Sequence, residues 1–226
     1  MTIASPAGPT PQPLIKPEFL VLGAVSAGHL ISHFHILVLP VLFPFFKETF
    51  GVGYVELGLA LTLFNVVSGL TQAPMGFLVD RIGARRVLIA GLLLGAASFA
   101  SLGLVMTYSW MLVTAVLAGL ANCVYHPADY AILNARMSEA RMGRAFSIHT
   151  FAGYLGGAIT PAIMLFVVYA AGLRAALIVA GLLAVVAAAL LLLMPTGAEK
   201  STSHMKVKRP AKSENSFPPA SFGSIV

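Results

Sequence analysis

Long stretches without a charged side chain are the feature that most limits what this sequence can fold into. Hydrophobic residues make up 58% of the 226 residues, the mean hydropathy is +0.89, and charged residues make up 10%. The uncharged stretches lie between Glu18 and Lys47, Glu56 and Asp80, Arg86 and Asp129, Arg144 and Arg174, and Arg174 and Glu199. A membrane-spanning helix needs about 20 apolar residues, so the stretch after Arg86 can hold two spans and each other stretch one. The sequence therefore predicts an all-α membrane protein with six transmembrane helices.

The spans divide the chain into one predicted domain, residues 18–195, and two tails. The two spans in the longest stretch are expected to separate at Tyr108, Ser109 and Trp110, where a polar turn meets interfacial aromatic residues. Residues 1–17 lack the basic region and apolar core of a signal peptide, and we expect a disordered N-terminal tail. Residues 196–226 are polar, and we expect a second disordered tail.

The basic residues are divided unequally between the two sides of a six-span chain. Only Lys47 and Arg174 fall on one side. The other 12 of the 14 basic residues fall on the opposite side: Lys16, Arg81, Arg85, Arg86, Arg136, Arg141, Arg144, Lys200, Lys206, Lys208, Arg209 and Lys212. Because Lys and Arg are retained in cytoplasmic loops, we expect both termini in the cytoplasm and a multi-pass protein of an inner or plasma membrane. Topology and attraction to anionic lipid explain the net charge of +6, and no nucleic-acid partner is expected.

Polar side chains recur on one helical face in four of the six expected spans. By span, these residues are Ser26, His29 and His33; Thr62, Asn65, Gly69 and Gln72; Asn122, His126 and Asp129; and His149, Gly153, Gly156, Gly157 and Thr160. The third span carries only small serines, and the sixth has no polar side chain. Along the chain, two spans with a polar face are followed by an apolar span, and this order occurs twice. It predicts a three-plus-three repeat in which spans one, two, four and five line a cavity or interface, and spans three and six lie outside.

The segment GFLVDRIGARRV, residues 76–87, concentrates charge in the turn between spans two and three. Retention of basic residues explains its arginines, and Gly83 can supply a tight turn. Neither charge retention nor a tight turn explains Gly76 and Asp80, which precede the arginines. Together, Gly76, Asp80, Arg81, Gly83 and Arg85 resemble the major facilitator superfamily signature G-x-x-x-D-R/K-x-G-R/K-R/K, which lies in the same turn. Ala84 departs from that pattern, and Arg86 stands one place beyond it.

This resemblance implies one six-span half of a major facilitator fold, and a permease that moves a small solute by alternating access. It also implies that Asp80 and Arg81 latch the cytoplasmic side in one transport state. The segments GHLISHFHILVLPVLFPFF, SGLTQAPMGFLVD, YHPADYAILNAR and RMGRAFSIHTFAGYLGGAITP are most similar to fosmidomycin-resistance-type exporters. Those exporters carry an acid soon after the first-span histidine and a His-Pro-Glu in span four. In this sequence His33 stands where those exporters have the first-span acid. Ala128 and Asp129 follow His126 and Pro127 where they have the His-Pro-Glu of span four.

Eight polar residues are candidates for a substrate or proton pathway: His29, His33, Asn65, Gln72, Asn122, His126, Asp129 and His149. An acid at membrane depth is costly and typically marks an ion or proton path. We therefore expect Asp129 and His126 to exchange protons while His29 and His33 face the substrate. The alternatives are an Asp129 that reaches water at the membrane edge and histidines that only pack. Pro127 is expected to bend its helix. Gly153, Gly157 and Pro161 are expected to serve helix packing.

Six spans are half the usual number for the family. The sequence allows a half that pairs with a second copy, a half that pairs with a separately encoded one, or a truncated gene product. Proton-coupled efflux is the expected activity, with the lipid bilayer and a small-molecule substrate as partners. A non-transporting assembly partner and an intramembrane enzyme with a histidine site are the alternatives. No G-x-S-x-G, H-E-x-x-H or Cys-His cluster is present, so we expect no enzyme activity, metal or cofactor.

Overall fold

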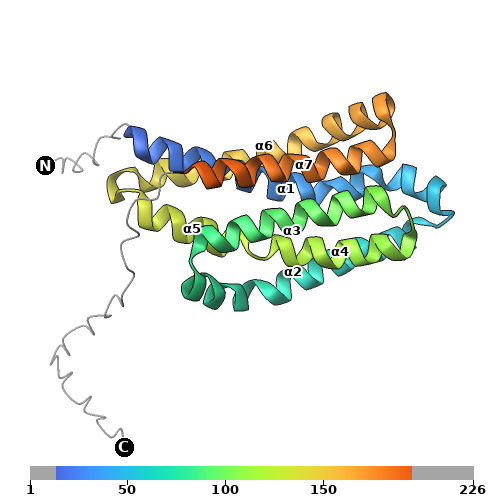
Figure 1. Ribbon diagram of the computed structural model, residues 1–226, viewed down its shortest axis with the longest axis horizontal. Helices are drawn as coiled ribbons and strands as arrows, with labels where there is room; N and C mark the ends of the chain where they lie inside the picture. The colour runs from blue at the N-terminus through green and yellow to red at the C-terminus, as the bar shows by residue number, and fades with distance from the viewer. Residues whose placement is uncertain (1–13, 195–226) are drawn as a thin grey trace, which may run out of the picture.

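The computed structural model describes residues 14–194, and within them the chain is folded into seven α-helices (Figure 1). These are α1 (Lys16–Phe50), α2 (Tyr54–Ile82), α3 (Ala84–Leu104), α4 (Tyr108–Asn122), α5 (Tyr125–Arg136), α6 (Glu139–Ala171) and α7 (Leu173–Leu193). Helices α4 and α5 are two parts of one span, so six segments are long and apolar enough to cross a membrane. The six-span all-α prediction is confirmed. Apart from residues 14–17, the two expected tails lie outside the described residues.

Local sequence explains where the spans end. Gly51, Gly83 and Gly172 end α1, α2 and α6, and each has a positive φ that favours glycine.

The turn between α3 and α4 lies just before the expected Tyr108–Trp110 position. The reason is Thr107, whose hydroxyl accepts a hydrogen bond from the Trp110 backbone N–H at 3.2 Å and caps α4. The expected bend at Pro127 appears as a turn at residues 123–124, because proline has no N–H to donate to the Cys123 carbonyl.

The helix contacts follow the predicted three-plus-three repeat. The first span packs most closely against the fifth, α1 on α6, and the fourth packs against the second, α4 on α2. The third and sixth spans, α3 and α7, pack against each other. In addition, α3 contacts α4 as α7 contacts α1. Exchanging the first three spans with the last three therefore turns the α1–α6 contact into the α4–α2 contact and the α3–α4 contact into the α7–α1 contact, and leaves the α3–α7 contact unchanged.

Two arginines join α3 and α7 at opposite ends of the pair. Arg85, in the first turn of α3, donates to the carbonyls of Leu191 and Leu192 at the end of α7, at 3.0 and 2.8 Å. Arg174, in the first turn of α7, donates to the carbonyls of Gly103 and Leu104 at the end of α3, at 3.0 and 2.9 Å. The last carbonyls of a helix have no partner within it, so each arginine satisfies the end of its neighbour.

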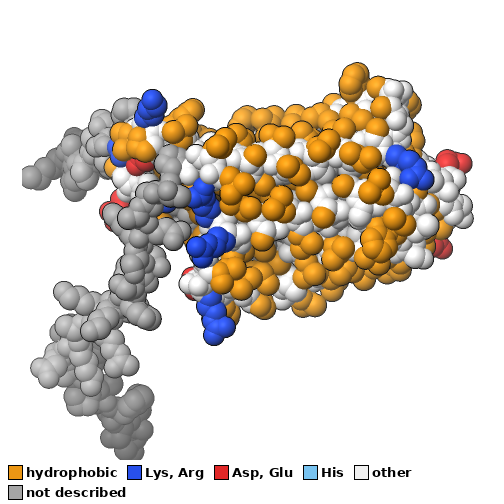
Figure 2. Space-filling model, viewed as in Figure 1, with side chains coloured by type: hydrophobic (Ala, Val, Ile, Leu, Met, Phe, Trp, Pro, Cys, Tyr) orange, Lys and Arg blue, Asp and Glu red, His pale blue; other side chains and the backbone are white. Residues whose placement is uncertain are grey.

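The least buried spans are α2 and α6. This differs from the expectation that spans three and six are the outer ones, because α3 and α7 pack closely on each other and on α4 and α1. Apolar side chains cover the flanks of the bundle, whereas Lys and Arg gather mainly at one end (Figure 2). Large exposed apolar residues on α2 and α6 include Val55, Leu59, Val66, Leu70, Phe77, Phe151, Tyr154, Phe166 and Tyr169.

Candidate functional site

A buried cluster of one acid and two histidines lies where α1, α5 and α6 meet. Asp129 on α5 is fully buried, and its Oδ2 lies 3.4 Å from His29 Nδ1 on α1 and 3.5 Å from His149 Nε2 on α6. The two imidazole rings stack with 4.0 Å between their centroids and 21° between their planes. Three residues distant in sequence thus place their polar atoms around one point.

The cluster lies well inside the bundle. At 1.5 Å per helical residue, His29 is about 20 Å along α1 from Lys16, and Asp129 is about 10 Å along α5 from Arg136. The same stretch of α5 contributes Ala128, Ile132 and Leu133 to the hydrophobic core. The Asp129 side chain has no solvent exposure in this structure. It therefore does not match the alternative in which Asp129 reaches water at the membrane edge.

A partly exposed rim connects the cluster to the surface of the bundle. The His33 and His126 rings lie 4.7 and 5.4 Å from the His29 ring, and both residues are only partly buried. Farther out, Tyr154 lies 6.1 Å from His33 between ring centroids, and Tyr130 lies 5.7 Å from His126. Both tyrosines are exposed. Polar rings therefore lead from the surface to the buried carboxyl group of Asp129.

Small residues on α6 let α1 approach closely enough to form this cluster. A Cβ atom on Gly153 would lie 2.6 Å from His29 Nε2, and one on Gly156 would overlap the Leu30 carbonyl. By contrast, a Cβ on Gly157 would meet Leu37 at 3.5 Å, an ordinary contact. The close approach therefore uses Gly153 and Gly156 rather than the expected pair of Gly153 and Gly157. Pro161, the third residue expected to serve packing, is exposed on α6.

The remaining pathway candidates are not part of the cluster. Asn122 donates to the Ser68 hydroxyl at 2.8 Å and so joins α4 to α2. Asn65 is exposed and donates to the Leu61 carbonyl of its own helix at 2.8 Å, and Gln72 is partly exposed on α2. The structure thus brings together five of the eight candidates and leaves three elsewhere.

His35 has a structural environment that differs from that of the cluster. Its Nε2 lies 3.0 Å from the Ala180 carbonyl of α7, and its ring lies 4.5 Å from the Phe99 ring of α3. It therefore links α1 to the α3–α7 pair.

The signature turn lies at the end of the bundle where α2 meets α3. Gly83 ends α2 with a φ of 92°, and the partly exposed Gly76 lies in the last turns of that helix. Asp80, Arg81 and Arg86 are exposed. Arg85 is different, because it caps α7 as described above. One of the three arginines thus has a structural role that charge retention did not predict.

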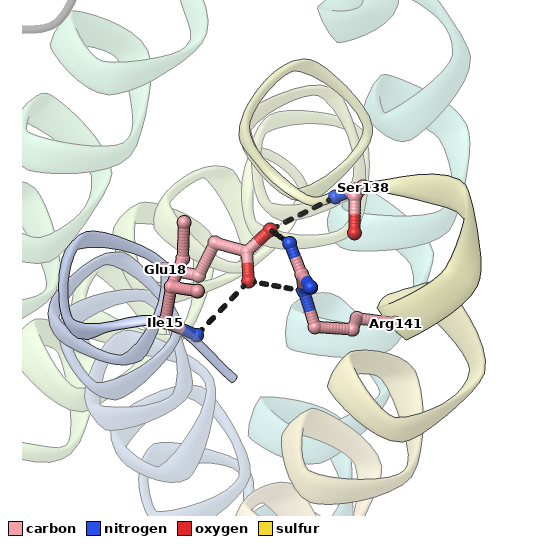
Figure 3. A network of polar contacts seen from close by, with 4 residues as sticks. All are labelled: Ile15, Glu18, Ser138 and Arg141. Carbon is pink, nitrogen blue, oxygen red and sulfur yellow. Dashed lines mark hydrogen bonds and ion pairs between the residues drawn. The ribbon is translucent and has the colours of Figure 1, made fainter. Parts of the chain in front are cut away.

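A buried ion pair joins the beginnings of α1 and α6 at the same end of the bundle. Glu18 Oε2 lies 2.6 Å from Arg141 Nε, and Glu18 Oε1 accepts from Arg141 Nη2 and from the Ser138 backbone N–H, both at 3.1 Å (Figure 3). The Ile15 backbone N–H also lies 3.4 Å from Glu18 Oε2. This network fixes the two helices that carry His29 and His149.

Sequence reasoning missed Glu18, Tyr130 and Tyr154. Glu18 looked like the charged boundary of a span, and nothing local indicates that it pairs with a residue over a hundred positions away. Tyr130 directly follows Asp129, and Tyr154 directly follows Gly153. This adjacency to candidate residues was the only available signal for the aromatic rim.

Comparison with known proteins places the chain in a family. The sequence matches the Major Facilitator Superfamily over residues 25–224. It is 27% identical over 173 residues to the fosmidomycin resistance protein of Escherichia coli strain K12, covering 75% of this chain and 42% of the relative. It is 30% identical over 168 residues to a probable sulfoacetate transporter of Cupriavidus necator, covering 74% and 39%.

A third relative is the multidrug resistance protein MdtH of Aeromonas hydrophila, 31% identical over 116 residues, or 50% of this chain and 28% of the relative. The chain spans about two fifths of the length of the first two relatives. The signature turn, the six spans and the match over most of the sequence lead to one assignment. The chain belongs to the Major Facilitator Superfamily of membrane transporters.

Proposed function

We propose that the chain moves a small anionic solute out of the cell in exchange for protons, by alternating access. The observation that carries the proposal is the buried carboxyl group of Asp129, which lies within 3.5 Å of imidazole nitrogens from two other spans. A lone charge at membrane depth costs about 2.5–3.5 kcal/mol even on insertion scales, so this carboxyl is expected to change partner or protonation state during transport. Imidazoles accept and release protons near neutral pH.

Each part of the site has a proposed role. Asp129 carries the coupled proton, and His29 and His149 exchange it with the carboxyl oxygen in place of the expected His126, because their nitrogens lie within 3.5 Å of that oxygen. His33 and His126 lie on the partly exposed side, where protonated rings would attract an anion. Sulfoacetate, named for one relative, is such an anion, and fosmidomycin, named for another, is the second probe that the relatives suggest.

The test uses inside-out vesicles that contain the full chain and a pH-sensitive dye. Adding fosmidomycin or sulfoacetate to energised vesicles should move protons in the wild type. Asp129→Asn keeps the size of the side chain but cannot ionise, so it should abolish this movement while membrane insertion stays normal. Glu139→Gln is the matched control, because Glu139 is exposed at the start of α6, and it should behave as the wild type.

Two outcomes would count against the proposal. A wild-type response in Asp129→Asn would remove Asp129 from proton coupling. A correctly inserted wild type that moves neither probe, and no proton, would favour the second candidate function, a non-transporting membrane partner.

We also propose that a second six-span unit, either a copy of this chain or a separately encoded half, covers the exposed faces of α2 and α6. Support comes from the position of Thr62 and Asn65, which are polar yet exposed on the same span as Leu59, Val66 and Leu70. Asn65 donates one amide N–H to the Leu61 carbonyl of its own helix, and lipid offers no partner for its amide oxygen, whereas a facing helix can supply one.

A bulky apolar substitution distinguishes lipid from a packed interface, because lipid accepts the extra volume. Leu70→Trp should reduce co-purification of this chain with its second unit, detected with two differently tagged copies and by mass analysis of the purified assembly. Leu182→Trp on the exposed face of α7 is the control and should have no effect. Recovery of the wild type from native membranes only as a single six-span chain would contradict the assembly.

A further inference from the structure

We propose that His29, Asp129 and His149 bind a divalent first-row transition-metal ion of the Zn²⁺ class. The sequence predicted no metal site, because these ligands come from three different spans and show none of the local spacings typical of metal motifs. The fold brings one ligand atom of each residue within 4.8 Å of the others. The three ligands are the residues to which the proton exchange is assigned, so a bound metal ion and the coupled proton would compete for the same atoms, and metal binding is therefore measured apart from flux.

The two separations from the carboxyl oxygen fit a shared cation better than direct hydrogen bonds, and because the two imidazole rings are stacked, one ring would rotate to direct its nitrogen at the same ion. Zinc binds imidazole nitrogen and carboxylate oxygen at about 2.0–2.2 Å, so neighbouring ligands of a tetrahedral ion lie about 3.3–3.5 Å apart. Asp129 Oδ2 lies 3.4 Å from His29 Nδ1 and 3.5 Å from His149 Nε2. These distances exceed the 2.7–3.2 Å of typical N–H···O hydrogen bonds, about 2.9 Å being most common.

The same atoms lack hydrogen bonds although they are buried. Within residues 14–194, His29 Nδ1, both Asp129 carboxyl oxygens and His149 Nε2 have no hydrogen-bond partner. Their residues are 4%, 0% and 1% exposed. Leaving buried polar atoms unpaired costs free energy, and most native structures avoid it. A metal ion would satisfy three of these four atoms at once and neutralise the carboxylate.

The chemistry of the ligands indicates which ions fit. Two imidazole nitrogens and one carboxylate oxygen suit Zn²⁺ and the neighbouring ions Co²⁺, Ni²⁺ and Cu²⁺, whereas Mg²⁺ and Ca²⁺ prefer oxygen ligands only. The thiol of Cys123 is directed to the Leu120 carbonyl at 3.0 Å, so it belongs to a different contact. Three protein ligands leave a fourth position for water or an anion.

An approach to the site exists on its rim. His126 is partly buried, its Nδ1 has no hydrogen-bond partner among the described residues, and its ring lies 5.4 Å from that of His29. His33 is also partly exposed, and its ring lies 4.7 Å from that of His29. Additional imidazoles beside the three ligands would let an ion pass from the surface to the buried site.

The test measures Co²⁺ binding to the full chain, purified in detergent without a polyhistidine tag. Four-coordinate Co²⁺ absorbs visible light much more strongly than hydrated Co²⁺, so absorption reports occupancy and geometry together. The wild type should bind one Co²⁺, which Zn²⁺ displaces and Mg²⁺ does not. Asp129→Asn and His149→Gln should each weaken binding at least about tenfold, since each removes a ligand.

A glycine pair provides a test that keeps every ligand. Gly153→Ala would place a methyl group 2.6 Å from His29 Nε2 and displace that ring, so Co²⁺ affinity should fall about tenfold. Gly157→Ala meets only an ordinary 3.5 Å contact and should bind as the wild type. His204→Gln removes the histidine near the C-terminal end of the sequence and should also leave binding unchanged.

Circular dichroism and gel filtration establish that each variant is folded. A folded wild type that binds no Co²⁺, or His149→Gln and Asp129→Asn that bind it with wild-type affinity, would overturn the metal site. Proton movement is measured separately with a chelator present. Flux without Co²⁺ binding would refute the metal site alone, and Co²⁺ binding without flux would refute the transport proposal alone.

Discussion

At the scale of single residues, glycine positions decide how closely α1 and α6 approach. Gly156 faces the backbone of α1, where a Cβ would overlap the Leu30 carbonyl, and this carbonyl cannot move without shifting the helix. Gly157 is the next residue but points about 100° away around the helix, where the nearest atom is the end of the flexible Leu37 side chain. Adjacent glycines thus have different consequences for packing.

Gly156→Ala should therefore destabilise the protein by about 1–3 kcal/mol, the usual cost of overpacking, whereas Gly157→Ala should change stability little. Thermal unfolding in detergent, followed by circular dichroism, compares the two variants directly. Equal unfolding temperatures would mean that α1 and α6 are not held at this distance.

The residue scale also shows what periodicity can and cannot predict. Offsets of three and four residues correctly placed His29 with His33, and His126 with Asp129, on common helical faces. They could not show that His149 and His29 would both contact Asp129, because that depends on how three spans are rotated against one another. The same limit explains why the sequence favoured Gly157 over Gly156 as the partner of Gly153.

At the scale of elements, α3 and α7 are related by their arginine caps. Each is preceded by a glycine with positive φ and carries its arginine in the first turn, so the neighbouring helix ends beside a fixed cation. Charge distribution alone predicted the spans correctly but assigned Arg85 and Arg174 only to loops. The caps depend on antiparallel pairing of spans three and six, which no local pattern reveals.

Arg85→Gln and Arg174→Gln should each lower stability by about 1–2 kcal/mol, since each removes charged hydrogen bonds to helix carbonyls that are partly open to solvent. Arg86→Gln is the control, because Arg86 is exposed beside Arg85. The caps lie at opposite ends of the pair, so the double variant should show the sum of the single effects. Thermal unfolding compares the four variants with the wild type, and an Arg86→Gln effect as large as that of Arg85→Gln would contradict the assignment.

At the scale of the whole molecule, the two arginine caps reduce the number of basic residues that indicate the orientation of the chain in the membrane. One cap lies at each end of the bundle, so Arg85 and Arg174 are explained by structure whatever the orientation. When Arg85 and Arg174 are left out, Lys47 is the one basic residue on its side of the six-span chain, and 11 basic residues lie on the opposite side. The described members of the larger group lie at the end where α1 and α6 begin, which Figure 2 shows as the end with most Lys and Arg.

We therefore expect the strongly basic end, with both termini, to face the cytoplasm, because short loops rich in Lys and Arg are retained there. A reporter active only in the cytoplasm should work when fused after Thr196 and remain silent when inserted at Gly172, the turn between α6 and α7. Arg174→Gln should leave this pattern unchanged, since its cap is not what sets orientation. Activity at Gly172 with silence after Thr196 would invert the topology. It would also place the basic end of the bundle, with the signature turn between α2 and α3, on the external side.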